Sequence, residues 1–319
     1  MNIPWSLIPA AASLALATSL IAAESLIPLT EFPPDHSYHG ESGGLYGAAG
    51  NLPPPPLLES AMAQARRVQP LDPQGRPSPK GRIGLAAIGM SNTAREFSEF
   101  QRKARADASH NPLITLVNGA QGGMDSGDWA DPGTRLRQDQ PSPWDQLLQR
   151  VKSAHLTAAQ VQVLWISHAR RKPEALGSFP AHARTLEQDL RAITAEAERR
   201  FPNLRLVYFS SRNYAGYAKI RLNPEPFAYE SAFAVRQVVV DTANGRGEQP
   251  VRLWGPYPWS AGTTPRADGL TWLPGDFEAA DGTHPSNAGA AKIARLLLDF
   301  FRNDPTSRRW WNARSTPEN

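Results

Sequence analysis

The chain has 319 residues, of which 40% are hydrophobic and 20% are charged, and its net charge is +4. This is the composition of a globular protein long enough for one large α/β core or two small domains. The basic residues form no run interleaved with aromatic residues, so we do not expect nucleic acid as a partner. The absence of cysteine excludes disulfides, thiolate metal sites and a cysteine nucleophile, and it is neutral about the compartment.

The N-terminus is apolar and carries no charged side chain before Glu24. The run from Leu7 to Ala23 is short for a membrane span, contains a proline and ends in small residues that suit a signal peptidase. No lysine or arginine precedes the run, although export signals usually have one. We predict a cleaved signal peptide over residues 1–23 and an exported protein, periplasmic or extracellular. The alternatives are an uncleaved anchor and a misassigned start.

Residues 24–80 form a leader rich in proline and glycine, with an unbroken proline run at Pro53–Pro56. Proline fixes φ and lacks an N–H donor, so we expect no regular core here. We predict an exposed leader that wraps the following domain and is interrupted by a short helix over Leu57–Arg67. Three side chains that could in principle hold a metal are interpreted as ordinary polar loop residues: Asp35, His36 and His39.

From residue 81 onward, apolar runs alternate with amphipathic segments. The predicted strands are 82–89, 112–118, 160–167, 204–210 and 251–254. The predicted helices are 94–106, 143–155, 181–201, 229–241 and 286–301. This alternation predicts an α/β fold of the three-layer doubly wound, flavodoxin-like type, with a parallel sheet of about five strands. We place this domain at 81–305, followed by a C-terminal tail at 306–319 in which Trp310 and Trp311 form a hydrophobic latch.

The end of the first strand carries a candidate nucleophile. Functional sites in open α/β sheets lie outside the carboxyl ends of the strands. The sequence Gly89-Met90-Ser91-Asn92 follows the first predicted strand directly. Ser91 would therefore lie at a strand-to-helix turn, where helix amides can stabilise an anion. The alternative is that Ser91 only caps the helix.

A candidate general base and its carboxylate precede the last predicted helix, in Asp281-Gly282-Thr283-His284-Pro285. A serine hydroxyl becomes a nucleophile when a histidine removes its proton. That histidine needs a carboxylate to fix its tautomer and stabilise the imidazolium. In a tight turn Asp281 can place its carboxylate beside the His284 ring, and Pro285 can start the helix. The alternative is an Asx-type turn with an incidental histidine.

A serine after the first strand and an Asp-x-x-His block before the last helix together resemble the SGNH, or GDSL-like, hydrolases, over about Arg82 to Phe301. The Gly-Met-Ser-Asn sequence is similar to the Gly-x-Ser-Asn variant of some carbohydrate acetylesterases in this superfamily. The resemblance implies a serine esterase that forms an acyl-enzyme, with Ser91 as nucleophile and Asp281 and His284 completing a triad. It implies no cofactor and no metal.

The resemblance also implies an oxyanion hole formed by the amide of Ser91 and a glycine amide from the second block. Here Asn118-Gly-Ala-Gln-Gly-Gly123 follows the second strand. Family spacing favours Gly123, and Gly119 and Gly122 are alternatives.

The third block of these hydrolases usually supplies an asparagine, and this chain departs from that pattern. Ser167 and His168 stand after the third strand instead. We predict that the ring N–H of His168 serves as the oxyanion donor. Ser167 is a rival donor, and a histidine with no catalytic role is the remaining alternative.

Three further residues near these blocks are predicted to bind substrate: Asn92, Asp125 and Trp129. The aromatic residues Trp254, Tyr257, Trp259 and Trp272 are interpreted as packing residues, with sugar stacking as the alternative. The preferred substrate is an O-acetyl ester on a carbohydrate, so the expected partner is a small-molecule or polysaccharide ester. The alternatives are a lipase or acyl esterase and a catalytically weak glycan-binding protein. We expect no membrane contact after signal cleavage, and the sequence predicts no oligomeric state.

Overall fold

A computed structural model describes residues 26–244 and 250–313 of the chain. The predicted signal peptide lies outside the described residues. Five parallel strands form one sheet in the order β2-β1-β3-β4-β5. The strands are β1 (Ile83–Gly89), β2 (Ile114–Asn118), β3 (Val161–Ser167), β4 (Leu206–Ser210) and β5 (Val251–Trp254). This is the flavodoxin-like order of doubly wound sheets, so the predicted fold class and all five strands are confirmed.

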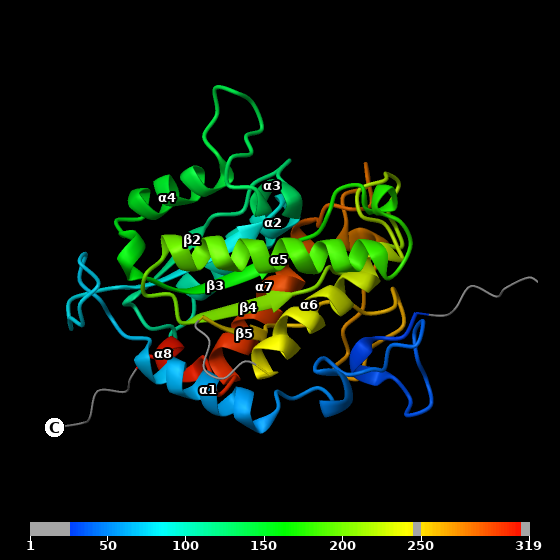
Figure 1. Cartoon of the computed structure of the whole chain (residues 1–319), viewed down its shortest axis with the longest axis horizontal. Helices are drawn as coiled ribbons and strands as arrows, with labels where there is room; N and C mark the ends of the chain where they lie inside the picture. Colours follow the sequence, from blue (N-terminus) through cyan, green and yellow to red (C-terminus); the bar gives the residue numbers. More distant parts are fainter. Residues whose placement is uncertain (1–25, 245–249, 314–319) are drawn as a thin grey trace, which may run out of the picture.

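Helices cover both faces of the sheet, as Figure 1 shows, with α5 and α6 in front and α7 behind. The longer helices are α1 (Pro55–Arg67), α2 (Ser91–Arg105), α4 (Pro143–Ser153), α5 (Ala181–Arg200), α6 (Phe227–Asn244) and α7 (Asn287–Asn303). The shorter ones are α3 (Ser126–Ala130), α8 (Arg308–Trp311) and the 3₁₀ turns Leu29–Glu31, Gly47–Ala49, Ala158–Gln160, Pro173–Leu176 and Pro274–Asp276. Because every face is covered, β1 and β3 are buried along their whole length.

The N-terminal segment, residues 26–80, packs on the sheet domain and shares its core. Leu29, Tyr38 and Tyr46 are all at least 94% buried. Tyr38 donates its hydroxyl hydrogen to the buried Glu230 of α6 at 2.6 Å, and Tyr46 accepts from the amide of Trp254 at 3.3 Å. The prediction of an exposed leader was therefore wrong in part. The segment does wrap the domain, but its aromatic side chains are buried because each hydroxyl finds a polar partner.

Other aromatic residues fill the interior. Trp254, Tyr257, Trp259 and Trp272 are each no more than 5% exposed, so their interpretation as packing residues is confirmed. Trp311 of α8 is fully buried and stacks on Phe301 of α7, with ring centroids 5.0 Å apart. The start of the predicted C-terminal tail is thus part of the fold and acts as the expected latch. In the described part of the chain no helix combines the length and apolarity needed to cross a membrane.

Candidate active site

Ser91 lies at the carboxyl edge of the sheet, as the first residue of α2 directly after β1. Met90 holds the N-cap position of this helix and the Ser91 hydroxyl makes no capping hydrogen bond, so the capping alternative is not what the structure shows. The turn requires glycine at position 89. A Cβ there would lie 2.3 Å from Thr93 Oγ1 and 2.4 Å from the Ser167 carbonyl oxygen. Thr93 Oγ1 donates to that carbonyl at 2.7 Å, which fixes the start of α2 on β3.

The structure brings Ser91, His284 and Asp281 together in one chain of hydrogen bonds. Ser91 Oγ lies 2.8 Å from His284 Nε2, and His284 Nδ1 lies 2.7 Å from Asp281 Oδ2. The histidine and aspartate side chains are 21% and 22% exposed, so a small molecule can reach them from solvent. This arrangement lets the histidine accept the serine proton while the carboxylate holds the opposite ring nitrogen.

The turn from Asp281 to His284 is rigid. Asp281 Oδ1 accepts from the amides of Thr283 and His284 at 2.8 and 2.9 Å. Gly282 has φ +62°, and a Cβ there would lie 1.9 Å from the carbonyl oxygen of Tyr217. Partial burial acts to raise the pKa of Asp281, but the hydrogen bonds from the two amides and from His284 outweigh it. The net pKa is lowered, so the carboxylate stays ionised at neutral pH.

Contacts between loops place the histidine turn against the serine turn. Asn92 Nδ2 donates to the Thr283 carbonyl at 2.9 Å, and the Lys219 amide donates to the Asp281 carbonyl at 2.8 Å. Asn92 is 2% exposed. The structure therefore places Asn92 between the serine turn and the histidine turn, where its side-chain amide holds the two together and does not serve the predicted substrate binding.

The glycine loop after β2 supplies candidate oxyanion amides. A Cβ on Gly122 would lie 3.6 Å from Ser91 Cβ, and Gly123 has φ +81°. Within the described residues no acceptor is recorded for either amide N–H. The alternative Gly119 lies under the loop, where a Cβ would be 2.6 Å from the Ala87 carbonyl oxygen, so this glycine serves packing. The structure places Gly122 next to the nucleophile and Gly123 one residue further along.

His168 is buried directly after β3, with 1% of its surface exposed. Its Nδ1 accepts from the Ala169 amide at 3.2 Å, so the proton of the neutral ring is on Nε2. Burial lowers the pKa of His168 to about 3, with Asp125 opposing the shift, and the ring is therefore neutral at working pH. Nε2 is covered and finds no acceptor among residues 26–244 and 250–313.

The other two residues predicted to bind substrate are used elsewhere. Trp129 is fully buried, with its ring centroid 5.0 Å from that of Trp144, so it cannot contact a ligand. Asp125 is 7% exposed and caps α3 by accepting from the amides of Gly127 and Asp128 at 3.0 and 3.2 Å. In the described residues no group of three His, Cys, Asp or Glu side chains is placed to hold a metal ion.

A second serine motif lies in the N-terminal segment. Gly40-Glu-Ser-Gly-Gly44 matches the Gly-x-Ser-x-Gly pattern of α/β-hydrolase nucleophiles. Its confirmation would require a strand-to-helix turn, but the motif lies in the N-terminal segment, where a Cβ on Gly43 would meet Phe32. Among the residues that the structure describes, Ser91 is the serine whose hydroxyl is hydrogen-bonded to a histidine ring.

No protein-family model and no curated protein matches this sequence. Several solved structures are similar to this chain. A GDSL-like lipase from Bacteroides thetaiotaomicron aligns over 76% of this chain and 95% of its own, at 11% identity and a TM-score of 0.40. An acetyl xylan esterase aligns over 68% and 98%, at 13% identity and a TM-score of 0.41. An extracellular lipase from Streptomyces rimosus aligns over 68% and 99%, at 14% identity and a TM-score of 0.38.

The strand order and the places of the serine and Asp-x-x-His blocks on it agree with the resemblance drawn from the sequence. The chain has a doubly wound α/β fold with strand order β2-β1-β3-β4-β5, as expected from that resemblance. Of the four sequence blocks, the first and last meet in the Ser91–His284–Asp281 chain, the second places Gly122 beside Ser91, and the third has the buried His168 where the resemblance implies an asparagine.

Proposed function

We propose that this protein is a serine esterase in which Ser91 attacks the carbonyl carbon of a carboxylic ester. The hydrogen-bonded chain from Ser91 through His284 to Asp281 is the observation that carries the proposal. His284 Nε2 takes the Ser91 proton as the C–O bond forms, and then gives it to the leaving alcohol. Water, deprotonated by the same histidine, hydrolyses the acyl-enzyme and restores the serine. The ionised Asp281 stabilises the imidazolium in both steps.

The amides of Ser91 and of the glycine loop are the proposed oxyanion donors. Negative charge develops on the carbonyl oxygen in the transition state, and donors that are already fixed stabilise it without rearrangement. Gly122 leaves open backbone beside Ser91 Cβ, and Gly123 follows it directly in the chain. This placement supports amide donation by Gly122 as well as by Gly123.

Turnover of a chromogenic acetyl ester by wild type and Ser91→Ala tests the proposal. We expect Ser91→Ala to lose turnover to the uncatalysed rate. We also expect a fluorophosphonate to add one covalent mass to wild type, located on Ser91 by peptide mapping, and none to the variant. An exposed serine such as Ser42 provides the control substitution, Ser42→Ala, which should keep wild-type kcat. Equal turnover by wild type and Ser91→Ala would refute the nucleophile.

His168 is proposed as a third oxyanion donor. A buried N–H without an acceptor is rare in folded proteins and is often found where function requires it. If substrate closure brings the oxyanion to Nε2, His168→Ala should lower kcat by about 10²-fold, and His168→Asn should recover part of the loss. A variant that melts at lower temperature but retains kcat would assign His168 to packing alone.

The substrate proposed first is an O-acetyl ester on a carbohydrate, supported by the Gly-x-Ser-Asn form of the first block. One structural observation favours the second candidate, an esterase for longer acyl chains. Leu136 is 52% exposed, and its side chain lies 3.4 Å from where a Cβ on Gly123 would be, so an apolar surface adjoins the oxyanion loop. Comparing kcat/KM for acetyl, butyryl and octanoyl esters of one alcohol separates the two candidates. A rise in kcat/KM with chain length favours the esterase for longer acyl chains, and a fall favours the acetylesterase.

A further inference from the structure

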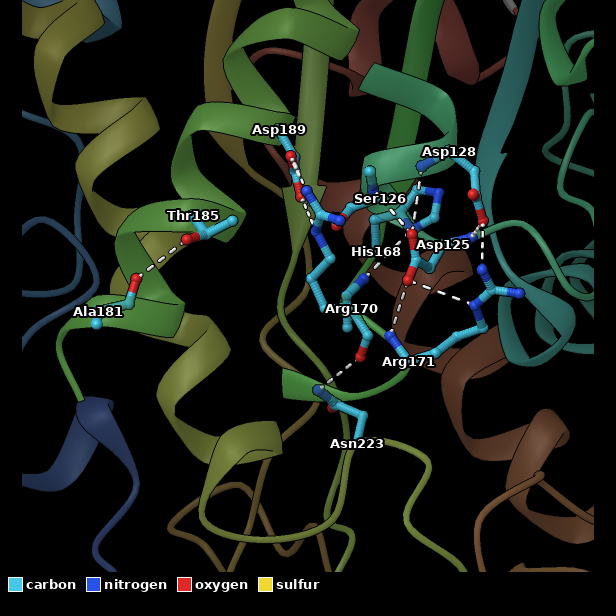
Figure 2. A network of polar contacts seen from close by, with 12 residues as sticks. Asp125, Ser126, Asp128, His168, Arg170, Arg171, Ala181, Thr185, Asp189 and Asn223 are labelled. Carbon is cyan, nitrogen blue, oxygen red and sulfur yellow. Dashed lines mark hydrogen bonds and ion pairs between the residues drawn. The ribbon is translucent and has the colours of Figure 1, made fainter. Parts of the chain in front are cut away.

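Two consecutive arginines follow β3 and bind different parts of the molecule (Figure 2). Arg170 donates to both carboxylate oxygens of Asp189 on α5, at 2.5 and 2.7 Å. Arg171 reaches the glycine loop instead. Its Nη1 donates to the Gly123 carbonyl at 2.5 Å, and its Nη2 donates to Asp128 at 3.0 Å. Of these two side chains, only that of Arg171 contacts the loop that carries the oxyanion amides.

Arg171 is itself held firmly. Its backbone amide and Nε both donate to Asp125 Oδ2, at 3.1 and 3.4 Å. Burial acts to raise the pKa of Asp125, but hydrogen bonds from the Arg171 and Asp128 amides and the charges of the two arginines lower it overall. On the other side, the backbone N–H of Asn223 donates to the Arg171 carbonyl at 3.3 Å. A planar guanidinium with several fixed partners directs its remaining donor at one point.

The glycines lie between two anchors. Upstream, the Gln121 amide donates to the Gly89 carbonyl at 2.9 Å, and the Gln121 side chain donates to the Pro143 carbonyl at 2.8 Å. Downstream, the Gly123 carbonyl accepts from Arg171. Glycine has more backbone freedom than any other residue, and neither Gly122 nor Gly123 has a side chain to hold it. The direction of their N–H groups therefore depends on the anchors at each end.

We propose that Arg171 is a positioning residue that fixes the oxyanion amides of Gly122 and Gly123 by binding the Gly123 carbonyl. The inference rests on the proposed function, since it requires those amides to face a developing oxyanion. A fixed donor stabilises charge without reorganisation, whereas a mobile loop has to be ordered in each transition state. Because the oxyanion exists only there, the loss of Arg171 should appear in kcat and leave KM nearly unchanged, provided KM reports binding.

The test compares Arg171→Met with its neighbour Arg170→Met, which removes the same charge and a comparable ion pair without touching the glycine loop. We expect Arg171→Met to lower kcat for an acetyl ester by about 10²-fold, the loss typical of a misplaced catalytic group, with KM within about threefold of wild type. Arg171→Lys keeps the charge and one donor, so it should recover part of the loss. Arg170→Met should lower Tm at least as much and keep kcat within about threefold of wild type.

Each other outcome overturns the inference. If Arg171→Met keeps kcat while Ser91→Ala is inactive, the esterase proposal stands and the positioning role is wrong. If Arg171→Met raises KM at constant kcat, the arginine binds substrate instead. If both arginine variants lose kcat and Tm in parallel, Arg171 acts on folding alone. If Ser91→Ala is as active as wild type, the proposed function fails first. The rate at which a fluorophosphonate labels Ser91 in Arg171→Met gives a second readout that does not depend on the choice of ester.

Discussion

Replacing His284 with alanine is expected to lower kcat for ester hydrolysis by about 10⁶-fold, the scale of loss when a serine hydrolase loses its base. His284 Nε2 is 2.8 Å from Ser91 Oγ. Without it, no other ring nitrogen among the described residues is recorded within hydrogen-bond distance of that hydroxyl, so the serine keeps its proton at neutral pH. Turnover of an acetyl ester by purified protein, corrected for the uncatalysed rate, measures the loss.

Two comparisons separate loss of the base from loss of the fold. His155 is exposed at the end of α4, near the start of β3 and thus at the opposite edge of the sheet, so His155→Ala should keep wild-type kcat. Because His284→Ala leaves an open space beside Ser91, added imidazole should restore part of the activity in a concentration-dependent way. Wild-type turnover by His284→Ala would rule out this histidine as the base.

The substitution Asp281→Asn is expected to lower kcat by about 10⁴-fold while leaving the turn in place. The amide oxygen of asparagine can still accept from the backbone amides of Thr283 and His284. Its NH₂ group, however, donates to His284 Nδ1 and forces the proton onto Nε2, where the ring can no longer accept from serine. The exposed Asp299 on α7 supplies the matched control, Asp299→Asn. A loss below about tenfold would show that the carboxylate is not required.

Asp281 also gives the stability of the protein a pH dependence whose sign is fixed by its lowered pKa. An ionised Asp281 is preferred in the folded state over the unfolded state, where an ordinary aspartate has a pKa of about 3.9. Its stabilising contribution is therefore complete above that pH and is lost as pH falls through the folded pKa. The difference in unfolding free energy between wild type and Asp281→Asn should be constant at neutral pH and shrink in acid. Chemical denaturation across pH measures it.

The sequence was sufficient to predict the strands of the sheet. It was also sufficient to predict the site residues that follow β1 and precede α7. Strands such as β1 and β3 are continuous apolar runs, which periodicity identifies, and the rule that sites lie past the carboxyl ends of strands then selects Ser91 and His284. Six helices were predicted to within a few residues of their bounds because their apolar residues recur at helical spacing. The short helix α3 was missed because Gly127 and Asp128 are poor helix formers, although the capping box from Asp125 to Asp128 was a readable signal.

The direction of side chains beyond the strand ends could not be predicted. Asn92 and Asp125 lie just after β1 and β2, where a ligand-binding residue is expected. In the structure, however, the side chain of each is hydrogen-bonded to another loop. The sequence could not decide which glycine amide faces the site, because that depends on the surroundings of each glycine in space. Of Gly119, Gly122 and Gly123, only Gly119 is crowded by neighbouring backbone. The role of Arg171 has no local sequence signal at all. The partners of its side chain are 43 to 48 residues away along the chain, and only the fold brings them together.

The buried contacts of the N-terminal segment bear on the order in which the chain can fold. Tyr38 and Glu230 are 192 residues apart, and Tyr46 and Trp254 are 208 apart. Tyr38 and Tyr46 therefore cannot reach their buried sites until Glu230 of α6 and Trp254 of β5 are in place. Such distant pairings are slow to form because long loops must close first. The docking of the N-terminal segment, residues 26–80, is thus expected to be the last step of folding.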